Sequence, residues 1–360
     1  MEEPTPPPPP EPLEPPSVVA ELPRLPPPPP PSPVRVAVDL TVPVLRAALY
    51  LIVYVLIQYA EILGMIAFAR LSGEDLFRPG GVGRSSEFFL ALTVLTIPLQ
   101  IAVTWLFVHF LDRRPMASIG LRRPEGGPGA GWRQLVTAPL GAVAVLGAWL
   151  ALVLALPASL AAVHYGGFSP DLSPGPAWWP LPPYLLLLGL LVGFILQGGL
   201  EELIIRGYVY HTLRERWRPW ISALGSSVLF AVLHLNNPDV SVSALLNIVL
   251  AGMVLAALVE RTGSLWSATL AHGAWNFAVA CLLSVPVSGV QIFHLLNVTI
   301  SGKPALTGDG FGPEGSWLLT LIGIVLTAFL WRGLWRRPSE RGAAAARLSA
   351  PEDRISPVSS

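Results

Sequence analysis

Two adjacent glutamates, Glu201 and Glu202, lie at the end of an apolar run long enough to cross a membrane. From Tyr184 to Leu200 the chain reads YLLLLGLLVGFILQGGL, and Arg206 follows shortly after. Ionised side chains at membrane depth are costly, usually face a protein interior or a wet cavity, and mark function. On a helix, Glu202 and Arg206 share a face and can form an ion pair, whereas Glu201 points about 100° away. One carboxylate is therefore held by the arginine and the other is left for chemistry; the alternative is that both are neutralised within a helical bundle.

Two later apolar segments carry histidines at a similar depth. FAVLH places Phe230 and His234 four residues apart, and HGAWN does the same for His272 and Asn276. Alone, each pattern also fits a hydrogen-bonded core histidine or a polar clamp between helices. At 1.5 Å per residue, Glu201, His234 and His272 lie roughly 16 to 24 Å from the arginines that bound their segments. A carboxylate, two imidazoles and an amide at one depth predict an active site.

The composition indicates a membrane protein. Of the 360 residues, 52% are hydrophobic and 13% charged, and the mean hydropathy is +0.57. A soluble domain has about 25% charged residues. The net charge is zero, so nothing points to a nucleic-acid partner. The single cysteine, Cys281, excludes an internal disulfide framework and a cysteine-rich zinc site.

The apolar segments predict an all-α fold, a polytopic membrane helical bundle of about eight transmembrane helices. A span needs roughly 20 apolar residues, and the candidates are 43–69, 87–111, 136–163, 184–206, 219–236, 241–260, 264–284 and 316–335. We expect a membrane domain over 41–336, preceded by a disordered proline-rich cytoplasmic tail at 1–40 and followed by a disordered tail at 337–360.

Arginine placement predicts the orientation of the bundle. The loops after the second, fourth, sixth and eighth candidates all carry arginine, whereas two of the alternate loops, 164–183 and 235–240, contain neither lysine nor arginine. Basic residues mark cytoplasmic loops. Both termini are therefore expected in the cytoplasm, although the loop at 70–86, which contains three arginines, fits this pattern poorly.

The polar motifs resemble those of a known family. EELIIRG, FAVLH and GSLWSATLAHGAWN are similar to the EExxxR, FxxxH and HxxxN motifs of the CAAX-protease and bacteriocin-processing (CPBP) family of intramembrane endopeptidases. The resemblance covers about residues 90–280, and Ile205 stands where the family often has phenylalanine. The proline-rich head and the last predicted span lie outside this core.

The resemblance implies a role for each motif residue. In the family, the first glutamate and the FxxxH histidine are thought to activate a water molecule, which here means Glu201 and His234. The last histidine and asparagine are thought to form the oxyanion hole, which maps onto His272 and Asn276. Peptide hydrolysis needs both functions, an activated water and a stabiliser for the tetrahedral oxyanion.

The remaining motif residues, Glu202 and Arg206, are expected to orient the site. No cofactor is expected. The alternative is a Zn²⁺ enzyme with Glu201, His234 and His272 as metal ligands. HExxH is absent, and Asn276 suits an oxyanion donor better than a zinc ligand, so we favour the metal-free version.

We therefore expect an intramembrane endopeptidase, located in the bacterial inner membrane as a multi-pass protein. Its partners would be a membrane-associated or lipid-anchored protein or peptide cut near its end, the lipid bilayer, and a possible partner of the proline-rich tail. One alternative is a non-enzymatic membrane scaffold or bacteriocin immunity protein. Another is a transporter with Glu201 as proton carrier, which would predict internal repeats and broken helices that are not evident.

Overall fold

The computed structural model describes residues 33–71, 86–124, 130–168, 182–291 and 295–339. The described residues from Asp39 onward belong to one compact unit. Most of the predicted tails, 1–40 and 337–360, lies outside the described residues. The first helix, α1, spans Pro33–Leu71, so it begins before the predicted tail ends.

Helices account for most of the described chain, which confirms the all-α membrane fold class. Five segments are long and apolar enough to cross a bilayer, namely Asp39–Gly64, Leu92–Leu111, Gly131–Leu154, Tyr184–Arg214 and Val242–Thr262. Two shorter apolar helices accompany them, Pro219–Leu233 and Trp317–Trp331. Within the described residues, the predicted count of eight spans is therefore not confirmed.

The helices follow the predicted segments, but several end earlier or change type. The longer ones are α1, α2 (Ser86–Leu106, followed by a π-helical turn Phe107–Leu111), α3 (Ala130–Leu154), α4 (Pro183–Glu202) and α7 (Val242–Thr262). The others are α5 (His211–Arg214), α6 (Pro219–Leu233), α8 (Leu265–Phe277, followed by a π-helical turn Ala278–Leu282), α9 (Pro304–Thr307) and α10 (Trp317–Trp331).

The third predicted span, 136–163, does not extend as a helix to its end. The helix α3 stops at Leu154, and the residues from Ala161 to Phe168 form strand β1. This strand pairs antiparallel with β2 (Leu296–Gly302), with Ala161 opposite Gly302. A strand segment rich in β-branched and aromatic residues resembles a helical apolar run by composition alone, and only its partner strand distinguishes the two.

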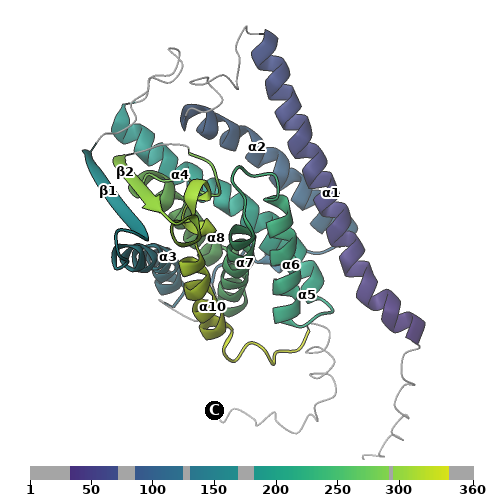
Figure 1. The fold of residues 1–360 in the computed structure, drawn as a ribbon. Helices are drawn as coiled ribbons and strands as arrows, with labels where there is room; N and C mark the ends of the chain where they lie inside the picture. Colours follow the sequence, from purple (N-terminus) through teal and green to yellow (C-terminus); the bar gives the residue numbers. More distant parts are fainter. Residues whose placement is uncertain (1–32, 72–85, 125–129, 169–181, 292–294, 340–360) are drawn as a thin grey trace, which may run out of the picture. The chain divides into compact units, whose positions relative to one another are not determined.

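The helix α8, which carries the HGAWN motif, packs against α3, α4 and α7 (Figure 1). The helix α7 also packs against α6 and α10. The helix with His272 and Asn276 therefore packs directly on α4, which carries the two glutamates, whereas α6, which leads to His234, packs on α7.

Candidate active site

Three glycines let α4 and α8 approach closely. A Cβ atom added to Gly273 would lie 2.6 Å from the Cα of Ile195, and one added to Gly199 would lie 2.9 Å from the Cγ2 of Thr269. At Gly198 a Cβ would lie 3.1 Å from the backbone nitrogen of Gly273. Small residues allow this kind of close packing between membrane helices. The close approach brings His272 against the two glutamates of α4.

Glu202 is fully buried and holds two of the predicted site residues. Its Oε1 accepts hydrogen bonds from Nη1 of Arg206 at 3.1 Å and from Nδ1 of His272 at 2.9 Å. The ion pair with Arg206 is the one that the sequence spacing predicts. The bond to His272 was not foreseen, and it fixes the ring because the ionised carboxylate can only accept, so Nδ1 carries the proton.

The guanidinium of Arg206 is enclosed by the surrounding helices. It lies over the ring of Phe230, 4.7 Å from the centroid, an arrangement favourable to a cation. Its Nη2 faces Gly252, where an added Cβ would lie 2.7 Å from it and 2.5 Å from the Oγ of Ser227. Gly252 therefore leaves the space that the buried arginine occupies.

A π-helix begins directly after Glu202. It spans Leu203–Tyr210, and all eight of its side chains are buried. Such segments are rare and are frequently found at functional sites. The two glutamates thus sit at the last turn of regular α-helix before a stretch that is buried on every side.

Glu201 is oriented by an amide that the sequence interpretation missed. Its Oε1 accepts from Nε2 of Gln197 through a short hydrogen bond, and Oε1 of Gln197 in turn accepts from Nδ2 of Asn276 at 3.1 Å. The Oε2 of Glu201 lies 3.6 Å from Nε2 of His272. The side chain of Glu201 is 24% exposed, whereas that of Glu202 has no exposure. Gln197 precedes Glu201 by one helical turn in an apolar span, and this spacing is the sequence feature that could have predicted their contact.

His234 lies just beyond the end of a helix. The fifth predicted span, 219–236, is too long, because α6 ends at Leu233 and His234 is its C-terminal cap. The Nδ1 of His234 donates to the backbone carbonyl of Phe230 at 2.9 Å. A carbonyl can only accept, so Nδ1 carries the proton of this bond, and Nε2 is the ring nitrogen not used by it.

The structure brings the four predicted catalytic side chains to one cavity of about 360 Å³, lined by Glu201, His234, His272 and Asn276. Gln197, Phe230, Asn237 and Ser288 also line it, together with Tyr54 from α1. A larger cavity of about 690 Å³ shares His234, His272 and Asn276 and continues between apolar residues of α3, α7 and α10. The two imidazoles and the amide are therefore shared between the smaller cavity, which Glu201 lines, and a larger, mostly apolar one.

A second unforeseen residue of this region is Glu314, which precedes α10. It lines the larger cavity with His234, His272 and Asn276, and its Oε1 accepts from Nε1 of Trp275 at 2.8 Å. No local pattern connects a glutamate this far along the chain with the earlier motifs, since only the tertiary fold brings it near.

The three possible zinc ligands are not gathered as a metal site. Among the described residues, no group of three or more histidine, cysteine, aspartate or glutamate side chains is placed to hold one metal ion. Glu201 and His272 are close to each other, but His234 does not join them in such a group.

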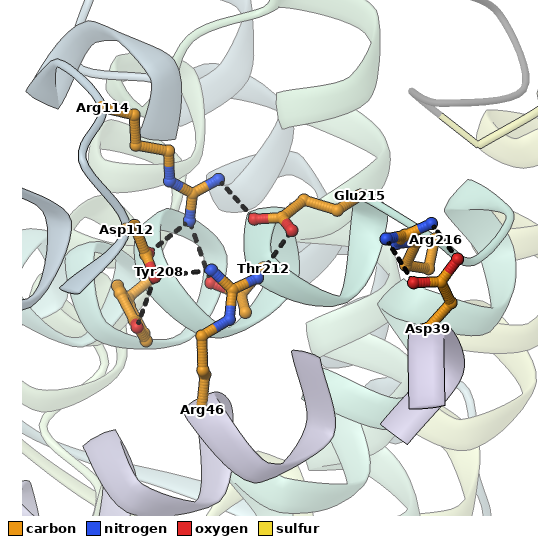
Figure 2. A network of polar contacts seen from close by, with 8 residues as sticks. All are labelled: Asp39, Arg46, Asp112, Arg114, Tyr208, Thr212, Glu215 and Arg216. Carbon is orange, nitrogen blue, oxygen red and sulfur yellow. Dashed lines mark hydrogen bonds and ion pairs between the residues drawn. The ribbon is translucent and has the colours of Figure 1, made fainter. Parts of the chain in front are cut away.

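A separate polar cluster attaches α1 to the rest of the bundle. We call it the α1 ion cluster, and it consists of Asp39, Arg46, Asp112, Arg114, Glu215 and Arg216 (Figure 2). The buried carboxylate of Asp112 accepts from Arg46 at 2.7 Å and from Arg114 at 2.9 Å. Both arginines also contact Glu215, while Asp39 pairs with Arg216. None of these residues belongs to the predicted catalytic set.

Comparison with protein families identifies the central part of the chain. Residues 182–278 match the family described as type II CAAX prenyl endopeptidase Rce1-like. The matched stretch contains all the motif residues and Gln197, and it ends before Glu314. A comparison with curated proteins gives no match. The family match confirms the resemblance carried by the motifs.

Proposed function

Because residues 182–278 match the Rce1-like type II CAAX prenyl endopeptidases, we propose that this protein is a glutamate-type intramembrane endopeptidase. At the level of the family, the match implies peptidase activity, and the long apolar helices indicate an integral membrane protein. The observation that carries the finer proposal is that Glu201, His234, His272 and Asn276 line one cavity.

In the proposed first step, Glu201 and Nε2 of His234 bind a water molecule. The water oxygen attacks the carbonyl carbon of the scissile peptide bond, and its proton passes to Glu201. The carbonyl π-electrons move to the oxygen, which becomes the oxyanion. Gln197 supports this role because its amide hydrogen bond fixes one oxygen of Glu201 and leaves the other facing His272.

The oxyanion would be held by His272 and Asn276. Asn276 uses one amide proton for Gln197 and has a second one to donate. His272 has a carboxylate beside each ring nitrogen, Glu202 at Nδ1 and Glu201 at Nε2, which suits the doubly protonated imidazolium. In that form Nε2 also donates. The tetrahedral intermediate then collapses, the C–N bond breaks, and the leaving amine takes the proton from Glu201.

The proposed substrate is a membrane-associated or lipid-anchored protein or peptide, cut near its end. The apolar continuation of the cavity between α3, α7 and α10 supports a substrate that lies partly in the bilayer. Prenylated CAAX proteins are the substrate class named for the matched family. For this chain a prenyl group is one form that such a lipid anchor could take, and peptide processing without it is the other.

We further propose that the protein is a multi-pass protein of the bacterial inner membrane with both termini in the cytoplasm. The distribution of arginines between loops supports this orientation. The proline-rich segment would then be available to a cytoplasmic partner with an aromatic-lined groove. No nucleic-acid partner is proposed.

The decisive experiment uses the full chain reconstituted in liposomes. It is offered matched peptides with and without a C-terminal prenyl group, each with and without a chelator. We expect cleavage by the wild type that persists with chelator and is lost in Glu201→Ala and His272→Ala. The matched control is Asp309→Asn, which removes an exposed negative charge outside the cavities and tolerates the positive φ of this position.

Each competing reading gives a different result. A wild type that binds the peptides without cutting them would establish the scaffold or immunity alternative. Loss of activity with chelator, restored by Zn²⁺, would overturn the metal-free version. Cleavage that survives Glu201→Ala would overturn the assigned base.

A further inference from the structure

Glu314 is a buried carboxylate that hydrolysis as described above does not use. Its Oε1 accepts from Nε1 of Trp275 at 2.8 Å, and its Oε2 accepts from both the backbone nitrogen and the Oγ of Ser288, the latter at 3.0 Å. Burial raises the pKa of this carboxyl above its ordinary value, while these three donors oppose the shift. A carboxylate that meets three donors is an acceptor at a fixed position.

The loop that carries Glu314 is already held by its main chain. Nδ2 of Asn247 donates to the carbonyl oxygens of Glu314 at 2.7 Å and of Ser316 at 2.9 Å. The Oγ of Ser243 donates to the carbonyl oxygen of Gly315 at 2.6 Å. Because α7 fixes the loop through these backbone contacts, the side chain of Glu314 is not required for that task.

The partners of the Glu314 side chain lead to both sides of the active site. Trp275 directly precedes Asn276, the proposed oxyanion donor. On the other side, the carbonyl oxygen of Ser288 accepts from Nδ2 of Asn237 at 2.9 Å, and the backbone nitrogen of Asn237 donates to the carbonyl of His234 at 3.0 Å. Glu314 is also near enough to His234 to interact with it electrostatically.

We propose that Glu314 is a positioning residue of the active site, which sets the separation between the helix carrying Asn276 and the segment carrying His234. This inference rests on the proposed function and adds to the site a residue outside the family match. Removing the carboxylate leaves an indole N–H, a backbone N–H and a hydroxyl without their acceptor in a buried place. Both walls are then expected to shift, because the hydrogen bonds through which Glu314 connects them are gone.

The test compares Glu314→Gln and Glu314→Ala with Asp309→Asn in the full chain. Asp309 is an exposed carboxylate in the same loop, and asparagine tolerates its positive φ of 52°. In Glu314→Gln the amide keeps the side chain's shape but turns an N–H₂ towards the donors of Ser288. We expect kcat to fall about 10- to 100-fold, as is typical when a residue that orients a catalytic group is lost. We expect KM to change less than about twofold and Asp309→Asn to match the wild type.

A second measurement does not depend on catalysis. In protein labelled with ¹⁵N on tryptophan, asparagine and histidine side chains, Glu314→Gln should shift the signals of Trp275, Asn276 and His234. Single substitutions of these three residues assign the signals. Unmoved Asn276 and His234 signals, or a kcat that falls only in proportion to the folded fraction, would overturn the inference. If the wild type cleaves nothing, the proposed function fails, and the side-chain signals still decide whether Glu314 connects the two walls.

Discussion

The active site and the α1 ion cluster are both polar groups within an apolar bundle, yet their charges are arranged differently. In the α1 ion cluster three carboxylates face three arginines, and each carboxylate is bonded by at least one of them (Figure 2). At the active site Glu201 and Glu202 have one arginine between them, and it pairs with Glu202. Glu201 instead contacts an amide, that of Gln197, and an imidazole, that of His272, and faces a cavity.

This difference indicates which cluster can do chemistry. In a balanced set of ion pairs each charge is neutralised by a partner of opposite sign. Such a set attaches one helix to others and leaves no carboxylate available for a reaction. An excess carboxylate with one oxygen facing a cavity retains the capacity to take a proton. Replacements in the two clusters should therefore separate activity from stability.

The largest effect is expected for Glu201→Gln. The amide keeps the size of the side chain but cannot accept the proton of the attacking water. We expect kcat/KM to fall about 10²- to 10⁴-fold, the usual contribution of a general base, with unchanged thermal unfolding. Peptide cleavage by the reconstituted protein measures this. If Glu201→Gln cleaves peptides at the wild-type rate, Glu201 is not the base, and the active site and the α1 ion cluster do not differ in the way argued above.

Replacing Arg206 with methionine should destabilise the active-site region itself. Arg206 and Glu202 have no side-chain exposure, so the variant leaves the buried carboxylate of Glu202 without its arginine and with His272 as its remaining partner. Breaking such a pair costs about 3–5 kcal/mol. The measurement is denaturant unfolding in micelles. The double variant Arg206→Met with Glu202→Gln serves as the control, because it removes the unpaired charge and should recover part of the loss.

In the α1 ion cluster, Asp112→Asn should affect stability and leave catalysis unchanged. The side chain of Asp112 is fully buried and accepts from two arginines. Loss of these charge-assisted hydrogen bonds should cost about 1–3 kcal/mol. We expect a lower unfolding temperature with kcat/KM equal to that of the wild type below the transition. A fall in kcat/KM for fully folded protein would show that this cluster also serves the reaction.

The smallest effect is expected for Gln197→Met. Methionine fits the space but loses the bonds to Glu201 and Asn276, so both catalytic side chains lose a support. We expect about a tenfold lower kcat, at the low end for a residue that orients catalytic groups, with little change in stability. Gln197→Glu sharpens the result, because a second carboxylate beside Glu201 should lower kcat further through repulsion.

Local spacing in the sequence predicted part of the active site. The i,i+4 relation of Glu202 and Arg206 holds because both residues lie on one continuous helical segment. The spacing of His272 and Asn276 likewise places both on α8. The bond from His272 to Glu202 could not be foreseen, since it depends on how closely Gly198, Gly199 and Gly273 let two helices approach.

Where the chain changes conformation, apolar composition misled the prediction. The predicted fifth span runs to residue 236 and includes Leu235, but α6 ends at Leu233 with His234 as its cap. The same happened at β1, whose apolar residues follow α3. Glu314 lay beyond any pattern, because its partners Trp275 and Ser288 come from other elements. The predicted count of eight membrane spans is not confirmed within the described residues, because apolar runs do not reveal where a helix stops.

The π-helix from Leu203 to Tyr210 sets the angle about the helix axis between the two glutamates and the residues after Tyr210. This angle depends on the number of residues in the π-helix. Its backbone bonds run from i to i+5, so the segment contains more residues per turn than an α-helix. Deleting one residue there would let the segment close into an α-helix, with successive side chains about 100° apart. Either Glu201 and Glu202 or the buried residues after them would then turn away from their partners. We therefore expect a single deletion in this stretch to misalign the active site although every catalytic side chain is still present.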